Sequence, residues 1–184
     1  REGRKETKYS YQVPNQWQGK FTTLKVIGDK KGSGSNSIIR NNPEILDILR
    51  DRVNLPIKMI HVTRNPYDNI TTMMSKNKKG LEYSINSYFK KCQTIANLKQ
   101  KVGSNNFYEF KHEALIEQPQ IILKELCAFL NLAAPQDYLD DCASIIFRSP
   151  NQTRFNYKWT KESINFVQNQ IEQFDFLQGY SYDN

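Results

Sequence analysis

The sequence has few of the residues that build metal centres and no run that could cross a membrane. Its 184 residues include two histidines and three cysteines, which show no ligand spacing, so we expect no metal. No apolar stretch approaches the roughly 20 residues of a membrane-spanning helix. Cys92, Cys127 and Cys142 fall on predicted apolar helix faces, where a free thiol behaves as a small hydrophobe. Without a signal peptide or paired cysteines, we expect a cytoplasmic protein, or a Golgi lumenal one if an anchor lies upstream.

The chain also lacks blocks of like charge. Its formal net charge is +7, but the basic residues are spread along the chain, which suits an anionic ligand and does not favour nucleic acid or a membrane surface. With 38% hydrophobic and 12% aromatic residues, the chain has enough apolar material for a folded core.

Strand and helix patterns alternate, which predicts an α/β fold with a parallel sheet flanked by helices. We expect this domain at residues 24–184, after an N-terminal flap or linker at residues 1–23. The predicted strands are 24–27, a segment within 57–63, and 107–111. One predicted helix begins at Pro43, and others cover 66–77, 81–102, 119–130 and 135–147. The last predicted helix begins at Thr160 and stops at Gly179.

One of these strands ends in an arginine and turns at once into a helix. The segment Ile57–Thr63 is apolar and β-branched, Arg64 follows it, and Asn65-Pro66 then starts a helix with Asp68 in its first turn. A guanidinium beside the free N–H groups of a helix start is suited to bind a phosphate. The alternative is that Arg64 only caps the sheet edge beside acidic neighbours.

These residues resemble the cofactor signature of sulfotransferases that use 3′-phosphoadenosine 5′-phosphosulfate (PAPS). In that family an arginine ends the strand, an acid follows, and a hydroxyl residue stands eight positions after the arginine, here Thr72. The resemblance implies a P-loop NTPase-like three-layer sandwich, with Arg64 and Thr72 holding the ribose 3′-phosphate. The product cofactor would be 3′-phosphoadenosine 5′-phosphate (PAP).

Two later segments resemble the same family. Lys111-His112-Glu113-Ala114-Leu115, before Pro119 and an amphipathic helix, is similar to a segment in which an aromatic residue commonly lies near the adenine. His112 stands at that position and could stack or hydrogen-bond there, or be an ordinary surface histidine. The segment from Phe147 to Arg154 resembles the C-terminal phosphate loop, which implies that Arg148, Ser149 and Arg154 contact the cofactor.

The loop from Gly28 to Ser35 lacks the Gly-Lys-Ser/Thr ending of a nucleotide-hydrolysing P-loop. By the resemblance, Asp29 would be a general base, and Lys30 or Lys31 would neutralise charge on the sulfuryl oxygens. Alternatively, this loop itself holds the 5′-phosphosulfate. Because the family's phosphosulfate loop lies farther upstream of the arginine strand, we expect that loop to precede Arg1.

The resemblance thus implies transfer of a sulfuryl group from PAPS to a hydroxyl or amine, on a small-molecule or carbohydrate acceptor. Two other functions remain open from the sequence. One is a kinase-like P-loop enzyme, and the other is a non-catalytic basic α/β module that binds anionic ligands.

Overall fold

The computed structural model describes residues 13–16, 22–30 and 32–184. At its centre lie two parallel strands, β1 (Met59–Thr63) and β2 (Phe107–Lys111), paired in register from Met59 with Phe107 to Thr63 with Lys111. The connection between them contains α3 (Pro66–Asn77) and α4 (Leu81–Val102). Because the strands are parallel, their carboxyl ends share one edge, and the turns into α3 and α5 (His112–Glu117) leave from it.

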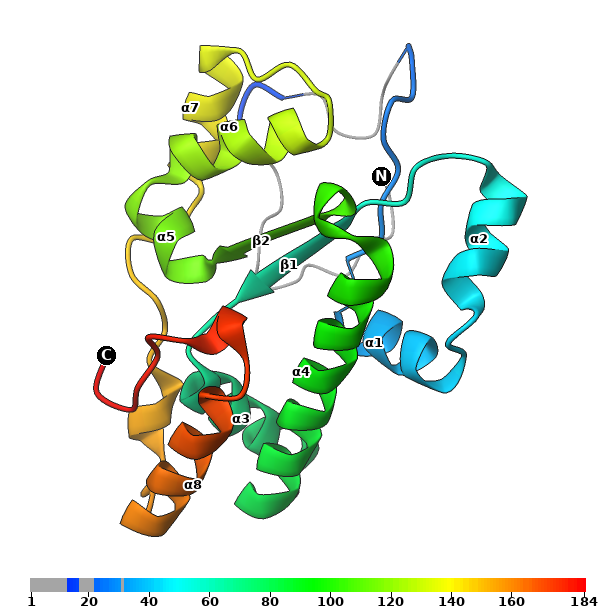
Figure 1. Ribbon diagram of the computed structural model, residues 1–184. Coiled ribbons are helices and arrows are strands. Elements are labelled where there is room, and N and C mark those ends of the chain that lie inside the picture. The colour runs from blue at the N-terminus through cyan, green and yellow to red at the C-terminus, as the bar shows by residue number, and fades with distance from the viewer. Residues whose placement is uncertain (1–12, 17–21, 31) are drawn as a thin grey trace.

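Helices flank this sheet in three groups (Figure 1). The first, α1 (Gly32–Asn41) and α2 (Ile45–Val53), lies beside α4. In the second, α5 leads into α6 (Pro119–Phe129), which packs on α7 (Gln136–Ser144). The third comprises α8 (Lys161–Ile171) and the C-terminal segment, which lie near α3 and the lower half of α4. Short 3₁₀ turns occur at η1 (Ser104–Asn106), η2 (Thr153–Asn156) and η3 (Asp175–Leu177). The prediction of a parallel sheet flanked by helices is confirmed.

The main core joins α3, α4, α8 and the C-terminal segment. Tyr67 of α3 is fully buried, its ring lies edge-on to Trp159, and its hydroxyl donates to the Ile164 carbonyl oxygen at 2.9 Å. The other buried members of this cluster are Ile70, Ile85, Phe89, Cys92, Val167, Ile171, Phe174, Leu177 and Tyr180. This packing fixes the start of α3 against the end of the chain, which brings two distant segments to the same place.

The cysteine prediction is also confirmed, since Cys92, Cys127 and Cys142 are all free and buried. Burial raises the pKa of Cys92 to about 12, so this thiol stays protonated and unreactive near neutral pH.

Three local predictions are wrong. Residues 24–27 form no strand, and Leu24, Val26 and Ile27 are exposed; a strand-like sequence needs a neighbour to pair with. The predicted loop from Gly28 to Ser35 is helical from Gly32 onward. The last helix ends at Ile171 rather than at Gly179. Gly179 instead has a φ of +85° in the turn after η3, a conformation that favours glycine.

No helix in the described part of the chain is long and apolar enough to cross a membrane.

Candidate functional site

The turn from β1 into α3 forms as the sequence predicts. The side chain of Asn65 accepts a hydrogen bond from the Tyr67 N–H at 3.0 Å, and Pro66 occupies the first turn of the helix. The same Asn65 side chain donates to the backbone carbonyl oxygens of Ser181 and Asn184, at 2.8 and 2.7 Å. Asn65 therefore caps α3 and at the same time ties the helix start to the C-terminal segment.

Arg64 lies at the edge of this turn with part of its hydrogen-bonding capacity unused. Its side chain is 23% exposed, its Nη2 donates to the Asn151 carbonyl oxygen, and the same atom lies 3.8 Å from Asp68 Oδ2. Its Nε is buried and has no hydrogen-bond partner among the described residues. A buried donor without a partner is costly, so this atom is the clearest sign of a ligand position at the strand end.

Asp68 and Arg154 form a buried ion pair behind Arg64. Arg154 is 1% exposed, and its Nη1 lies 2.8 Å from Asp68 Oδ2. The Arg154 N–H also donates to Asp68 Oδ1 at 2.8 Å. The remaining guanidinium nitrogens, Nε and Nη2, donate to the carbonyl oxygens of Tyr182 and Asn184, both at 2.7 Å. These contacts hold η2 and the C-terminal segment on the first turn of α3.

A second connection joins α3 to η2 through two hydroxyls. Thr72 Oγ1 and Thr153 Oγ1 lie 3.1 Å apart, and the Thr153 hydroxyl donates to the Asp68 carbonyl oxygen at 2.9 Å. Both threonines are partly buried. Thr72 of α3 is thus in direct contact with Thr153 of η2.

The end of β2 contributes a histidine and a glutamate. His112 Nδ1 is buried without a partner in the described part of the chain. Burial, together with the nearby positive charge of Arg64, holds the pKa of His112 below its usual value, although Glu113 acts in the opposite direction. Glu113 accepts from the Tyr180 hydroxyl at 2.6 Å and from the Asn65 N–H at 3.3 Å. Burial and this contact with Glu113 raise the pKa of Tyr180, so its hydroxyl stays a donor.

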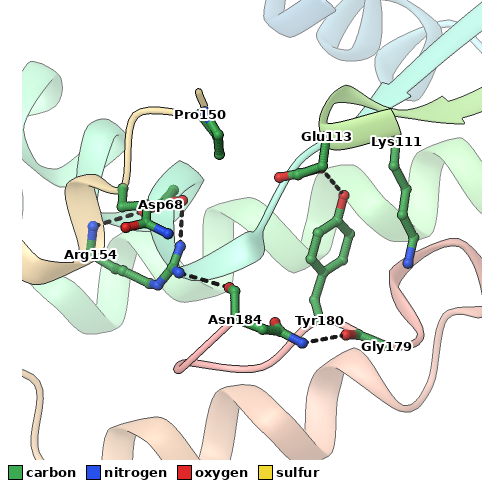
Figure 2. Close-up of a pocket in the computed structure, with 9 residues that line it drawn as sticks. Asp68, Lys111, Glu113, Pro150, Arg154, Gly179, Tyr180 and Asn184 are labelled. Atoms are coloured by element: carbon green, nitrogen blue, oxygen red, sulfur yellow. Dashed lines mark hydrogen bonds and ion pairs between the residues drawn. The ribbon is translucent and has the colours of Figure 1, made fainter. Parts of the chain in front are cut away.

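A cavity of about 220 Å³ opens between these segments (Figure 2). Lys111 lies at one side, where its Nζ donates to the Gln178 carbonyl oxygen at 2.9 Å and stands over the Tyr180 ring. The full lining is Asp68, Lys111, Glu113, Pro150, Gln152, Arg154, Gly179, Tyr180 and Asn184. Two acidic and two basic side chains line it, so their formal charges cancel.

Some of the predicted cofactor residues lie together in the structure, whereas others lie in an exposed loop. Arg64, Thr72, His112 and Arg154 all lie at the carboxyl ends of the strands or on the segment packed there. Arg148 and Ser149 are exposed in the loop that leads to η2. Because the buried Arg154 already has four protein hydrogen bonds, its contacts favour a structural role over direct contact with a phosphate.

Of the predicted catalytic residues, neither Asp29 nor Lys30 lines the cavity. Asp29 is exposed and accepts from the Ser35 hydroxyl at 3.2 Å, and Lys30 is also exposed. Both precede α1, which packs against α4. Lys31 lies outside the described residues. The catalytic roles of all three stay predictions.

Sequence reasoning missed three residues of the site. It noted Asp68 as an acid favourable to the helix start and as the acid of the family signature, but it predicted no contact for it, and it assigned no site role to Glu113 or Tyr180. Glu113 could have been found from its place in the His112-Glu113 pair that follows the strand. No local signal points to Tyr180, because its contact with Glu113 spans 67 residues.

Among the described residues, no group of three or more histidine, cysteine, aspartate or glutamate side chains could hold a metal ion.

Comparison with known proteins gives one family and two structural neighbours. Residues 56–136 match the model of the sulfotransferase family. No curated protein sequence matches the chain significantly. The sulfotransferase domain from the curacin biosynthetic pathway is 18% identical with a TM-score of 0.42, and the alignment covers 62% of this chain and 53% of that domain. The sulfotransferase domain of the Synechococcus PCC 7002 olefin synthase is also 18% identical with a TM-score of 0.42, covering 60% and 42%.

The chain therefore spans about half the length of these solved domains, or less. The matched segment runs from the start of the β1 region through α6 and contains Arg64, Thr72 and His112. This stretch, which is less than half of the chain, is similar to the sulfotransferase family model.

Proposed function

We propose that the protein binds PAPS at the carboxyl ends of β1 and β2 and takes part in transfer of its sulfuryl group to a hydroxyl or amine. The observation that carries this proposal is the pair of unsatisfied buried nitrogens, Arg64 Nε and His112 Nδ1. The two side chains are close enough for the charge of Arg64 to lower the pKa of His112. A phosphate oxygen beside Arg64 would satisfy Nε with a charge-assisted hydrogen bond.

The cavity near Asp68 is small for the whole cofactor, and of the predicted cofactor residues that the structure describes, Arg154 alone lines it. Its volume of about 220 Å³ lies below the roughly 300–1,000 Å³ of a typical small-molecule pocket. We assign the ribose and its 3′-phosphate to Arg64 and the start of α3, and the adenine side to His112. Thr72, which lies one hydrogen bond from Thr153, would offer its hydroxyl to the same phosphate.

The residues around Arg64 hold it in place for this task. Asn151 accepts one of its N–H groups, and Asp68 lies 3.8 Å from the same nitrogen. Because Asp68 is also paired with Arg154, its charge is shared, and Arg64 keeps the capacity to bind an anion. Arg148, exposed in the neighbouring loop, can add a second guanidinium to the phosphate without breaking an existing core contact.

When bound, PAPS would supply an activated sulfuryl group whose transfer spreads negative charge over its oxygens, and positioned cations would stabilise that charge. Asp29 is proposed as the base that takes the acceptor proton, with Lys30 or Lys31 as cations. The acceptor would be a small molecule or a carbohydrate.

A thermal-shift series with PAP, AMP and ATP with magnesium tests the proposal. Binding at the 3′-phosphate predicts a rise in the unfolding midpoint with PAP and little or none with AMP, since only PAP carries that group. A larger shift with ATP and magnesium would favour a kinase-like enzyme, and equal small shifts with all three would indicate non-specific anion binding. Either result would overturn the proposal.

A further inference from the structure

A second and larger cavity lies between α1 and α4, away from the strand ends. Its volume is about 780 Å³, and it shares no lining residue with the cavity at Asp68. Figure 1 shows α1 on the side of α4 that faces away from α8 and the C-terminal segment. The lining residues are Arg40, Tyr83, Asn86, Ser87, Lys90, Gln93, Thr94 and Asn97. We call this site the α1–α4 groove.

Seven of the eight lining residues form one stripe along α4. From Tyr83 to Asn97 they follow steps of three residues with two adjacent pairs, a pattern that places side chains on one helix face. With a rise of 1.5 Å per residue, this stripe is about 21 Å long. Arg40, in the last turn of α1, faces it from the other side. The groove is therefore an elongated and largely exposed surface along one face of α4.

The side chains of the groove are polar and cationic. Arg40 and Lys90 supply two positive charges, and no acidic residue is among the described residues that line it. Asn86, Gln93 and Asn97 supply amides, which both donate and accept hydrogen bonds. Gln93 donates to Asn97 at 2.9 Å, so these two amides are already ordered relative to each other.

An aromatic ring stands at one end of the stripe. Tyr83 is 49% exposed, and the ammonium of Lys79 lies 4.1 Å from its ring centroid. This places a third cation beside the groove. A half-exposed ring next to amides and ammonium groups can contact an apolar sugar face while its neighbours bind hydroxyls and anionic groups.

The wall formed by α1 is anchored to α4. Asn36 is 8% exposed, and its side-chain amide donates to the Lys91 carbonyl oxygen at 3.1 Å. Its Oδ1 is buried without a partner among the described residues. The hydrogen bond from Asn36 to Lys91 holds α1 against α4. Asn36 Oδ1 remains an unused acceptor between the two helices.

From these features we propose that the α1–α4 groove binds an acidic oligosaccharide, with sulfate or carboxylate groups on Arg40, Lys90 and Lys79 and sugar hydroxyls on the amides. A partner helix would need an apolar groove, but the described lining of this groove contains no aliphatic side chain. A nucleic acid strand would need aromatic platforms for successive bases, whereas Tyr83 is the one aromatic residue in the described lining. The groove and the cofactor site are separate, so this proposal stands independently of the proposed function.

The test is a binding titration of the whole chain with a heparin-derived octasaccharide, an uncharged dextran oligomer of the same length, and a single-stranded RNA octamer. The heparin fragment should bind, and the uncharged oligomer should bind much more weakly. No binding of the heparin fragment, or equally tight binding of the RNA, would overturn the proposal.

Two double variants separate the groove from net charge. Arg40→Gln with Lys90→Gln removes two charges from the groove, and Lys124→Gln with Lys161→Gln removes two from exposed positions elsewhere. The first pair should weaken binding about tenfold or more, because hydrogen bonds to charged groups are lost. The control pair should change it less than about twofold. Equal losses in both pairs would show attraction by overall charge and would refute the assignment.

A third variant tests recognition of the hydroxyls. Asn86→Ala with Asn97→Ala keeps every charge, so it should weaken binding while leaving its salt dependence unchanged. PAP should not compete with the oligosaccharide in any variant. Competition would place both ligands in one site and contradict a separate groove. An unchanged thermal unfolding midpoint in each variant confirms that the fold is intact.

Discussion

Asp68 and Arg154, 86 residues apart in the chain, form an ion pair whose side chains are 1% and 2% exposed. The pair joins the first turn of α3 to η2, and Arg154 extends the connection to the carbonyl oxygens of Tyr182 and Asn184. A buried ion pair therefore holds together the segments that form the candidate site. Such a contact becomes very costly when one partner is removed.

The first prediction concerns this pair. Asp68→Asn should lower the free energy of unfolding by about 3–5 kcal/mol, because it leaves the Arg154 guanidinium buried without its counter-charge. Urea unfolding followed by circular dichroism measures the change. Asp47→Asn is the control, since Asp47 forms an exposed ion pair with Lys101, and exposed pairs contribute little. Similar free energies of unfolding for the two variants would show that the buried ion pair does not stabilise the fold.

A second prediction concerns Glu109 on β2. Its carboxylate accepts from His61 at 2.7 Å and from Lys99 at 2.8 Å. Burial alone would raise the pKa of Glu109, but these two contacts outweigh it and hold the pKa below its usual 4.5. Because the unfolded chain then binds the proton more readily, the stabilisation is present above pH 4.5 and is lost as the pH falls through the lowered pKa.

Glu109→Gln should therefore cost about 1–3 kcal/mol at pH 7, and the difference from the unchanged protein should shrink as the pH falls below 4.5. Urea unfolding at several pH values measures this. A difference that stays constant with pH would mean that the charge of Glu109 does not contribute.

A third prediction follows from the lowered pKa of His112. Burial and the positive charge of Arg64 lower the pKa of this imidazole. A bound phosphate dianion would favour the protonated ring, so binding of PAP should take up a proton and tighten as the pH falls. Calorimetry in two buffers of different ionisation enthalpy measures proton uptake.

His112→Gln should reduce that uptake while the fold stays intact. The phosphate of PAP titrates in the same range, so the informative quantity is the difference between the two proteins. Identical uptake in both would remove His112 from the site.

The sequence predicted those parts of the site that depend on neighbouring residues. The start of α3 follows from Asn65 and Pro66, since a side-chain acceptor and a fixed φ act within one turn. The bounds of α4 agree with the approximate prediction, because its apolar residues recur at helical spacing over 22 positions. Both of these elements lie within residues 56–136, which match the sulfotransferase family model.

The rest depends on contacts that no local pattern encodes. Arg154 looked like a ligand because of its loop, yet Asp68 and two C-terminal carbonyl oxygens use its guanidinium. Residues 24–27 have the composition of a strand, but a strand forms only where a neighbour supplies backbone partners. In both cases the outcome was decided by a partner far away in the chain or by the lack of one in the described part.

The most direct test of the central claim is the affinity of Arg64→Ala for PAP, measured by calorimetry beside the unchanged protein and Arg52→Ala. Arg52 is an exposed arginine on α2, so its loss controls for net charge. We predict that Arg64→Ala binds PAP at least about tenfold more weakly, because a charge-assisted hydrogen bond is lost, while Arg52→Ala binds normally. Equal affinities in all three proteins would contradict a phosphate site at the end of β1.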